Sequence, residues 1–413
     1  MASPYRRVIL KLSGEALGLD GKLFCHEKFE QVARMLIDIQ HTGVELAVVI
    51  GGGNVWRGRR GAAMRMGTVA ADQMGMLATL QNCLYMRDTL DHLGARAVVM
   101  SGVDIPRFAE SYNTVAAIEH LRAGRILFLA CGLGNPCFST DSAVVLRAIE
   151  LECDAILMAK NIDGVYTADP RICPRAKKLD VINYDDMLEL SGSGAGVLQM
   201  RAVEFARKYN VVIHSRSAFS DAEGTYVKEE TDMMEEAVIT GIAHDTSEVK
   251  VTIRGVPDMS GVAAKLFSAL AGNQVSVDMI IQNVSEDGIT DISFTCPGAD
   301  EKRACETVER ILPDVNAREY VVDEDIAKVS IVGTGMKSSP GIAAKAFQTL
   351  GENNINILAI STSPIRLSVV VDGAQTAAAV RCLHTAFGLD SDSVFEETQL
   401  SAEEIAAKMN KGR

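Results

Sequence analysis

Five short apolar runs alternate with segments of helical spacing in the first half of the chain. The runs, each predicted to be a buried strand, are residues 7–12, 45–50, 96–100, 125–130 and 154–158. Residues 27–42 carry apolar side chains at helical spacing, and residues 68–93 continue a long helical pattern. Strands alternating with helices predict an α/β fold, an open and mainly parallel sheet with helices on both faces. Several runs lead at once into glycine, which places ligand loops at the carboxyl ends of strands.

The pattern changes near residue 228, where the acidic and apolar-poor stretch KEETDMMEE predicts a linker. An internal repeat follows: KVTIRG at 250–255 recurs as KVSIVG at 328–333, and SGVAAKLFSAL at 260–270 recurs as PGIAAKAFQTL at 340–350. Each copy is typical of a strand, a turn, a helix and two strands, so we predict two packed α+β modules. The predicted divisions are a catalytic domain at 1–228, a linker at 229–246, modules at 247–322 and 323–400, and a tail at 401–413.

Charge and cysteine content restrict the partners. The net charge of −13 over 413 residues argues against nucleic acid or an acidic membrane as a partner. The nine cysteines are odd in number and show no CxxC spacing, which indicates a reducing compartment without a disulfide framework or a metal site. The chain has no uncharged apolar stretch of ~18 residues, so we predict no membrane span. We therefore expect a cytoplasmic protein.

Four glycine-containing loops follow predicted strands and carry the candidate chemistry. They are Lys11-Leu12-Ser13-Gly14, Gly51–Asn54 with Arg57 beyond it, Gly132–Asp141, and Asn161–Pro170. Backbone N–H groups and an ammonium at strand ends suit a phosphate, although each loop alone is equally typical of a turn or a helix cap. Convergence of the loops on one edge of the sheet predicts a phosphate site. The absence of GxxxxGK[ST] and of HRD and DFG motifs argues against P-loop enzymes and protein kinases.

The motifs of the two halves resemble two related families. Residues 7–170 resemble bacterial UMP kinase through RVILKLSGEAL, VVIGGGNVWRG, ADQMGMLAT, GLGNPCFSTDSA and LMAKNIDGVYTADP. Residues 160–413 resemble aspartokinase with paired ACT domains, through NIDGVYTADPR, MLELSGSGAGVLQMRAVEFARKYNVV and VDMIIQNVSEDGITDISFTC. Both families share the amino-acid-kinase fold. The resemblance therefore implies that fold followed by two ferredoxin-like ACT domains, in a chain that looks like a chimera.

The UMP kinase resemblance implies a donor site for ATP with Mg²⁺ and an acceptor site for UMP. Lys11 is implied to stabilise the transferring phosphoryl group, and Asp169 to orient the metal or the nucleotide. The implied ATP contacts are Lys11, Ser13, Gly14, Gly53, Arg57, Lys160, Tyr166 and Asp169. The implied UMP contacts are Gly52, Asp72, Gly134, Asn135, Phe138, Ser139 and Thr140. The chain departs from the family at Leu133, Cys137, Lys160 and Val197-Leu198-Gln199, where other residues are usual.

The aspartokinase resemblance implies a small effector, lysine or threonine, bound where the ACT modules meet. The implied contacts are Asp258, Asp278, Gln282 and Asn283 in the first module and Asn354, Ile355, Ser361 and Thr362 in the second. The alternative is that these residues cap turns and strands. Both families assemble through their domains, so the resemblance also implies a homo-oligomer.

Three functions remain open from the sequence. The first is a UMP kinase-type site under ACT regulation, which the acceptor loops favour. The second is an aspartokinase that phosphorylates the β-carboxylate of aspartate, although the family's KFGGTS and GRGGSDTTA motifs are absent. The third is a binding or regulatory protein without activity.

Overall fold

The structure, a computed structural model, describes residues 5–19, 21–56, 64, 66–160, 162–217, 222–229, 239–282 and 288–390. These residues form two compact units. The first unit is made of described residues within Met1–Val165, Lys178–Ser191 and Gly196–Glu235. The second is made of those within Tyr166–Lys177, Gly192–Ala195 and Glu236–Arg413. Two short segments of the predicted catalytic domain, Tyr166–Lys177 and Gly192–Ala195, therefore belong to the second unit.

A nine-stranded sheet forms the centre of the first unit, in the order β4-β3-β5-β2-β1-β6-β10-β11-β9. Its strands are β1 (Arg7–Leu12), β2 (Glu45–Ile50), β3 (Ala97–Ser101), β4 (Glu110–Ser111), β5 (Ile126–Ala130), β6 (Ala155–Lys160), β9 (Val181–Ile182), β10 (Val212–Ser217) and β11 (Thr225–Val227). Of the strand pairs, β10 with β11 is antiparallel and the others are parallel. The mainly parallel sheet is confirmed, and the five predicted strands begin within one residue of the observed ones.

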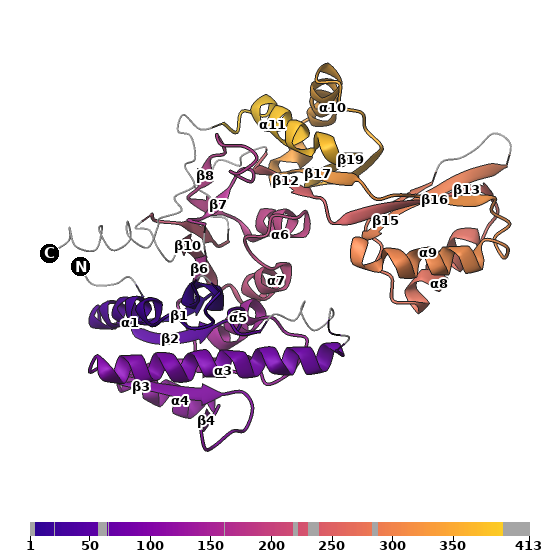
Figure 1. The fold of residues 1–413 in the computed structure, drawn as a ribbon. Helices are drawn as coiled ribbons and strands as arrows, with labels where there is room; N and C mark the ends of the chain where they lie inside the picture. Colours follow the sequence, from indigo (N-terminus) through magenta and orange to yellow (C-terminus); the bar gives the residue numbers. More distant parts are fainter. Residues whose placement is uncertain are drawn as a thin grey trace. The chain divides into compact units, whose positions relative to one another are not determined.

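Helices cover this sheet because its central strands are apolar toward both faces (Figure 1). They are α1 (His26–His41), α3 (Thr68–His92), α4 (Thr114–Arg122), α5 (Thr140–Glu150), α6 (Tyr184–Gly192) and α7 (Met200–Tyr209). Val8, Leu10 and Leu12 of β1 pack into a core with α1 and α3. Successive side chains of a strand point to opposite faces, so Lys11 points to the other face, where α5 packs against β1. The strands β7 (Val165–Tyr166) and β8 (Lys178–Leu179) form a separate two-stranded sheet.

Two four-stranded antiparallel sheets form the second unit, each with its helices on one face (Figure 1). One sheet has the order β14-β15-β13-β16, with β13 (Glu248–Pro257), β14 (Ile280–Gln282), β15 (Ile289–Pro297) and β16 (Glu319–Asp323) covered by α8 (Val262–Gly272) and α9 (Glu301–Ile311). The other has the order β12-β17-β19-β18, with β12 (Gly241–Asp245), β17 (Ile326–Val332), β18 (Ala359–Ser363) and β19 (Arg366–Asp372) covered by α10 (Ile342–Glu352) and α11 (Thr376–Ala386). The predicted pair of α+β modules is confirmed.

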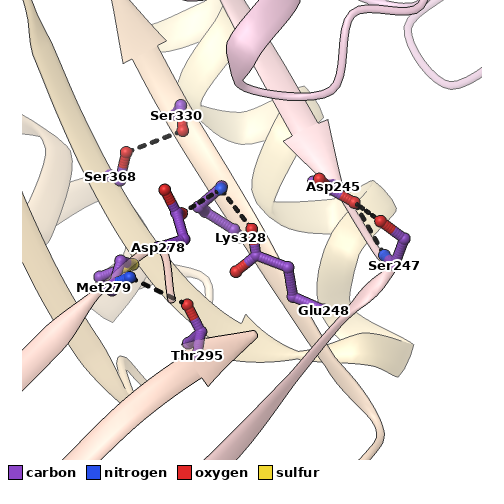
Figure 2. Close-up of polar contacts among 9 residues, drawn as sticks. All are labelled: Asp245, Ser247, Glu248, Asp278, Met279, Thr295, Lys328, Ser330 and Ser368. Carbon is purple, nitrogen blue, oxygen red and sulfur yellow. Dashed lines mark hydrogen bonds and ion pairs between the residues drawn. The ribbon is translucent and has the colours of Figure 1, made fainter. Parts of the chain in front are cut away.

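One edge strand of the second module precedes the first module in the sequence. β12 lies within the predicted linker at 229–246, yet it pairs with β17, placing Ala243 opposite Ser330. The turn after β12 is closed by Asp245, whose carboxylate accepts both the N–H and the hydroxyl of Ser247 (Figure 2). The first module is therefore an insertion between two neighbouring strands of the second module's sheet.

No helix within the described ranges is both long and apolar enough to cross a membrane.

Candidate active site

The ends of β1 and β2 meet at a point where no side chain fits. A Cβ atom added to Gly14 would lie 2.2 Å from the carbonyl oxygen of Gly51. A Cβ atom added to Gly52 would lie 2.8 Å from both the Cβ of Ala78 and the carbonyl oxygen of Gly75 in α3. These two predicted site glycines are thus required for close backbone packing, which brings the loops after the two strands together.

A buried ion pair lies at the same edge of the sheet. Lys11 Nζ is 2.8 Å from Asp141 Oδ1, and the two side chains are 10% and 8% exposed. Asp141 stands in the first turn of α5, and the Ser139 hydroxyl caps this helix by accepting the N–H of Ser142. A cation beside a helix N-terminus is an arrangement that favours a phosphate group.

One polar face of α3 holds the loops that follow β2 and β5. Asn82 is fully buried and donates to the carbonyl oxygen of Gly51 and to the side-chain oxygen of Asn54, each at 2.8 Å. The hydroxyl of Thr79 accepts the N–H of Cys131 at 2.8 Å. Thr79 and Asn82 are three positions apart and thus share a helix face. This face anchors two of the four loops that the sequence singled out.

Asp72 lies two helical turns before Thr79 on α3 and makes a second contact with the loop that follows β5. Its carboxylate accepts the N–H of Cys137 at 2.8 Å. Asp72 also lines a pocket of about 150 Å³. The residues that line this pocket are Gly52, Trp56, Ala71, Asp72, Gly75, Met76, Thr79, Cys131, Gly132, Leu133, Asn135, Pro136, Phe138 and Thr140. The structure thus brings five predicted acceptor residues, Gly52, Asp72, Asn135, Phe138 and Thr140, to one pocket.

Asp169 is held within its own loop, in the second unit. Its carboxylate accepts from the backbone N–H of Arg171 at 2.9 Å and from the guanidinium at 3.0 and 2.7 Å. Burial acts to raise the pKa of Asp169, but the hydrogen bonds and charge of Arg171 outweigh it and hold the pKa below its ordinary value. Asp169 is therefore an anion, as a residue that orients a metal or a nucleotide needs to be.

Three charged side chains meet between the two sheets of the second unit (Figure 2). Lys328 of β17 lies 2.6 Å from Glu248 of β13 and 2.5 Å from Asp278, while its own side chain is 3% exposed. The second carboxylate oxygen of Glu248 is buried and has no hydrogen-bond partner among the described residues. Burial alone would lower the pKa of Lys328, but the hydrogen bonds and charges of Asp278 and Glu248 raise it. We call these three residues the Lys328 cluster.

Two family models match the chain, one in its first half and one in its second half. The model of the amino acid kinase family matches residues 6–215, about half of the chain, and the ACT domain model matches residues 249–312 and 329–387. The chain belongs to the amino acid kinase family. It carries two ACT domains, which are the two modules of the second unit.

The relatives include both groups that the motifs resemble. An aspartokinase of Pseudomonas aeruginosa is 36% identical over 415 residues, covering 93% of this chain and 98% of that protein. An aspartokinase of Mycolicibacterium smegmatis is 46% identical over 257 residues, and this chain spans 61% of its length. The solved structure of UMP kinase from Bacillus anthracis is similar at 33% identity and a TM-score of 0.52, over 55% of this chain and 98% of that one. The predicted membership of the amino-acid-kinase superfamily, with mixed features, is confirmed.

Several residues that hold the kinase loops were not singled out from the sequence as site residues. Asp141 ends a loop in which Ser139, Thr140 and Asp141 are alternative predicted helix caps, and nothing in its spacing identifies Lys11 as its partner. Thr79 and Asn82 lie in a helix whose pattern is otherwise ordinary, and only their three-residue spacing offered a signal. Arg57, Asn283 and the side chain of Lys160 lie outside the described structure.

The predicted effector residues of the ACT domains occupy different environments. Asp258, Gln282 and Thr362 are exposed, and Ser361 is half-buried beside Thr362 on β18. Asn354 takes a left-handed backbone conformation, φ 55°, in the turn after α10. Ile355 is 5% exposed and packs in the core of the second ACT domain, so its side chain serves the core. Asp278 already binds Lys328, and an effector would have to share or displace that contact.

A further cluster of polar side chains lies beneath α11. Cys173, His384 and Asp390 place potential metal-ligand atoms within 4.8 Å of one another. His384 is fully buried, and its ring nitrogens lie 3.0 Å from Asp390 Oδ1 and 2.8 Å from the hydroxyl of Thr167. Burial lowers the pKa of His384, while Asp390 partly opposes this shift. Both ring nitrogens are thus engaged by protein atoms.

Proposed function

We propose that the chain is an ATP-dependent kinase that phosphorylates the β-carboxylate of aspartate and is regulated by its ACT domains. The observation that carries this proposal is the similarity to P. aeruginosa aspartokinase along 93% of the chain, since it includes both the kinase domain and the ACT pair. The order of preference from the motifs, which favoured UMP, is thereby reversed.

The size of the pocket supports a small acceptor. Its volume of about 150 Å³ is below the range of roughly 300–1,000 Å³ that is usual for sites of drug-sized ligands. Asp72 would pair with the α-ammonium group of aspartate, while Asn135 and Thr140 offer donors to its carboxylates. These roles are part of the proposal.

Phosphoryl transfer requires positioning and neutralisation of charge more than covalent participation by the protein. In the proposed mechanism Lys11 turns from Asp141 toward the developing charge on the γ-phosphoryl group, and the N–H groups at the start of α5 add donors. Ser13, Gly14 and Gly53 are proposed to approach the phosphates with their backbone, and Asp169 to orient the nucleotide. Mg²⁺ arriving with ATP neutralises the β- and γ-phosphates when bound.

UMP is a second candidate acceptor because of the side chains that line the pocket. Phe138 is 45% exposed at the pocket and offers an aromatic face to a base, and Asp72 could accept ribose hydroxyl groups. The similarity to B. anthracis UMP kinase supports this alternative.

The test is ADP release by the full chain with ATP and Mg²⁺ plus aspartate, and separately plus UMP. Each mixture is assayed with and without lysine and threonine, the proposed effectors. The proposal expects turnover with aspartate and a change in rate with one of the effectors. Turnover with UMP alone would support the second candidate, and no turnover with either acceptor would contradict both.

The domain division and assembly also remain proposals. We propose a kinase domain at 1–228 and ACT domains at 247–322 and 323–400, with β12 in the intervening segment as part of the second ACT domain. A homo-oligomer is proposed from the resemblance, and light scattering at several concentrations measures it.

A further inference from the structure

The loop of residues 166–177 is held by the second ACT domain through its backbone and through one side chain. The N–H of Ile242 in β12 donates to the carbonyl oxygen of Thr167 at 2.7 Å. The side chain of Thr167 is buried and its hydroxyl lies 2.8 Å from Nε2 of His384 in α11. Arg381, also in α11, donates to the carbonyl oxygen of Ile172. This loop contains Tyr166 and Asp169, two of the proposed ATP contacts.

The hydrogen bonds around His384 run in one direction. Asp390 is an acceptor when ionised, so Nδ1 of His384 carries a proton and donates to it at 3.0 Å. A fully buried imidazole is neutral by preference, which leaves Nε2 as an acceptor. The hydroxyl of Thr167 accepts the N–H of Lys177 at 2.9 Å and has two acceptors within reach for its own proton. These are Nε2 of His384 at 2.8 Å and the carbonyl oxygen of Leu389 at 3.4 Å, and the shorter contact favours Nε2. Every polar atom in this chain of contacts therefore has a complementary partner.

Two other interpretations of the same residues fit less well. A Thr–His–Asp set in this order resembles the arrangement that activates a nucleophile, but Thr167 is 3% exposed and His384 is fully buried, so a substrate does not reach them. A metal held by Cys173, His384 and Asp390 would have to break the bond between His384 and Asp390. Neither alternative accounts for these contacts, so we infer that His384 holds the side chain of Thr167 in place.

We propose that His384 is a positioning residue for ATP, which acts through Thr167 to hold Tyr166 and Asp169 in their binding conformation. Thr167 is the direct neighbour of Tyr166 and is separated from Asp169 by one residue, so an error at Thr167 displaces both. Misplacement of a substrate-positioning group by about 1 Å can cost ~10²-fold in rate. The inference rests on the proposed function insofar as it takes ATP as the donor, but it does not depend on the acceptor.

Direct binding of ATP with Mg²⁺ to the full chain tests the proposal. Thr167→Val keeps the shape of the side chain and removes the hydroxyl, so we expect ATP to bind about tenfold more weakly, while Thr167→Ser restores most of the affinity. His384→Gln places an amide where Nε2 lies and retains part of the affinity. His384→Asn reaches only toward Asp390 and loses as much as Thr167→Val.

The matched control is Ser330→Ala. Its hydroxyl is buried in the same ACT domain and bonds the hydroxyl of Ser368 in β19 at 2.8 Å, rather than a residue of the loop (Figure 2). We expect its ATP affinity to equal that of the parent, even if its thermal stability falls as much as that of Thr167→Val. Folded Thr167→Val and His384→Asn variants that bind ATP within twofold of the parent would overturn the inference.

The acceptor assay separates this inference from the proposed function. If the chain binds ATP and the variants weaken binding as expected, but aspartate is not phosphorylated, the acceptor assignment is wrong and the role of His384 stands. If KM for ATP rises in Thr167→Val while KM for the acceptor is unchanged, both stand. A parent chain that does not bind ATP overturns the role of His384 along with the proposed activity.

Discussion

The described structure buries two lysines, and they differ in the number of carboxylates that lie beside them. Lys11 has one carboxylate beside it, Asp141, and lies at the ends of strands next to the pocket. Lys328 has two carboxylates beside it, Glu248 and Asp278, and lies between the two ACT sheets. In the proposed mechanism Lys11 exchanges Asp141 for a phosphate. The Lys328 cluster has a net negative charge and holds its cation firmly.

The contrast shows why a buried lysine alone does not mark an active site. A buried charge needs a partner, and the number and accessibility of its partners decide whether a ligand can compete. We propose that Lys11 meets that condition, since an anionic phosphate would have to displace only Asp141. Lys328 does not, since a ligand would have to displace two.

The largest expected effect is that of Lys328→Met on stability. The substitution leaves two carboxylates without their shared cation. Glu248 is buried and has an oxygen that already lacks a partner in the described structure, while the side chain of Asp278 is 37% exposed. We expect a loss of about 3–5 kcal/mol in the free energy of unfolding, measured by urea denaturation. Arg254→Met is the control, because Arg254 and Glu319 form an exposed pair at 3.5 Å that contributes at most about 1 kcal/mol. Equal losses of stability in the two variants would show that the Lys328 cluster stabilises the fold no more than an exposed ion pair does.

The next effect is that of Lys11→Ala on catalysis. Removal of the ammonium group takes away a contact that is strongest in the transition state, so kcat should fall by ~10²-fold or more with little change in the acceptor KM. In the double variant Lys11→Ala with Asp141→Ala, kcat should stay low because the ammonium group is still absent. A single variant with kcat within a few-fold of the parent would contradict the role of Lys11.

A smaller effect distinguishes the two candidate acceptors at Asp72. Asp72→Asn keeps an oxygen that can accept from Cys137 or from a ribose hydroxyl, but it loses the negative charge. If aspartate is the acceptor, its KM should rise about tenfold through the lost contact with the α-ammonium group. If UMP is the acceptor, KM should change little. Asp91→Asn, an exposed position of the same helix, is the control.

The smallest effect is a pH dependence of the ACT pair. The pKa of Lys328 is raised in the folded state, so its contribution to stability is complete below the ordinary lysine value of 10.5 and is lost as pH rises through the folded pKa. The slope contributed by this single group is at most about 1.4 kcal/mol per pH unit. It is measured as the difference between the parent and Lys328→Met in urea unfolding from about pH 9.5 to about pH 11.5, roughly one unit either side of the free lysine pKa. Parallel profiles for the two proteins would show that the pKa is not raised.

Much of the kinase fold could be predicted because it depends on local pattern. The apolar run at 7–12 is followed by Ser13 and Gly14, and it becomes β1 with the predicted bounds. The repeat identified both ACT modules, since each copy has its own periodicity. The predicted acceptor residues Asp72, Phe138 and Thr140 converge on one pocket because parallel strands end at a common edge.

The remainder depends on which segments meet across long distances in the chain. The partner of Lys11 is 130 positions away, and the partners of Lys328 are 80 and 50 positions away, in a different module. β12 appeared as linker because five residues beside an acidic stretch carry too little pattern to show the sheet they join. The contact between Thr167 and His384 spans 217 positions.

By itself the sequence determined the five predicted strands of the kinase sheet, the duplication and the family, because each follows from motifs made of near neighbours. Only the tertiary structure decided which buried charge faces which partner. That choice reflects the cost of burying an uncompensated charge, which is met by residues brought together in space and is invisible to local pattern. The same cost makes Lys11 a candidate for phosphate binding and makes Lys328 part of the framework.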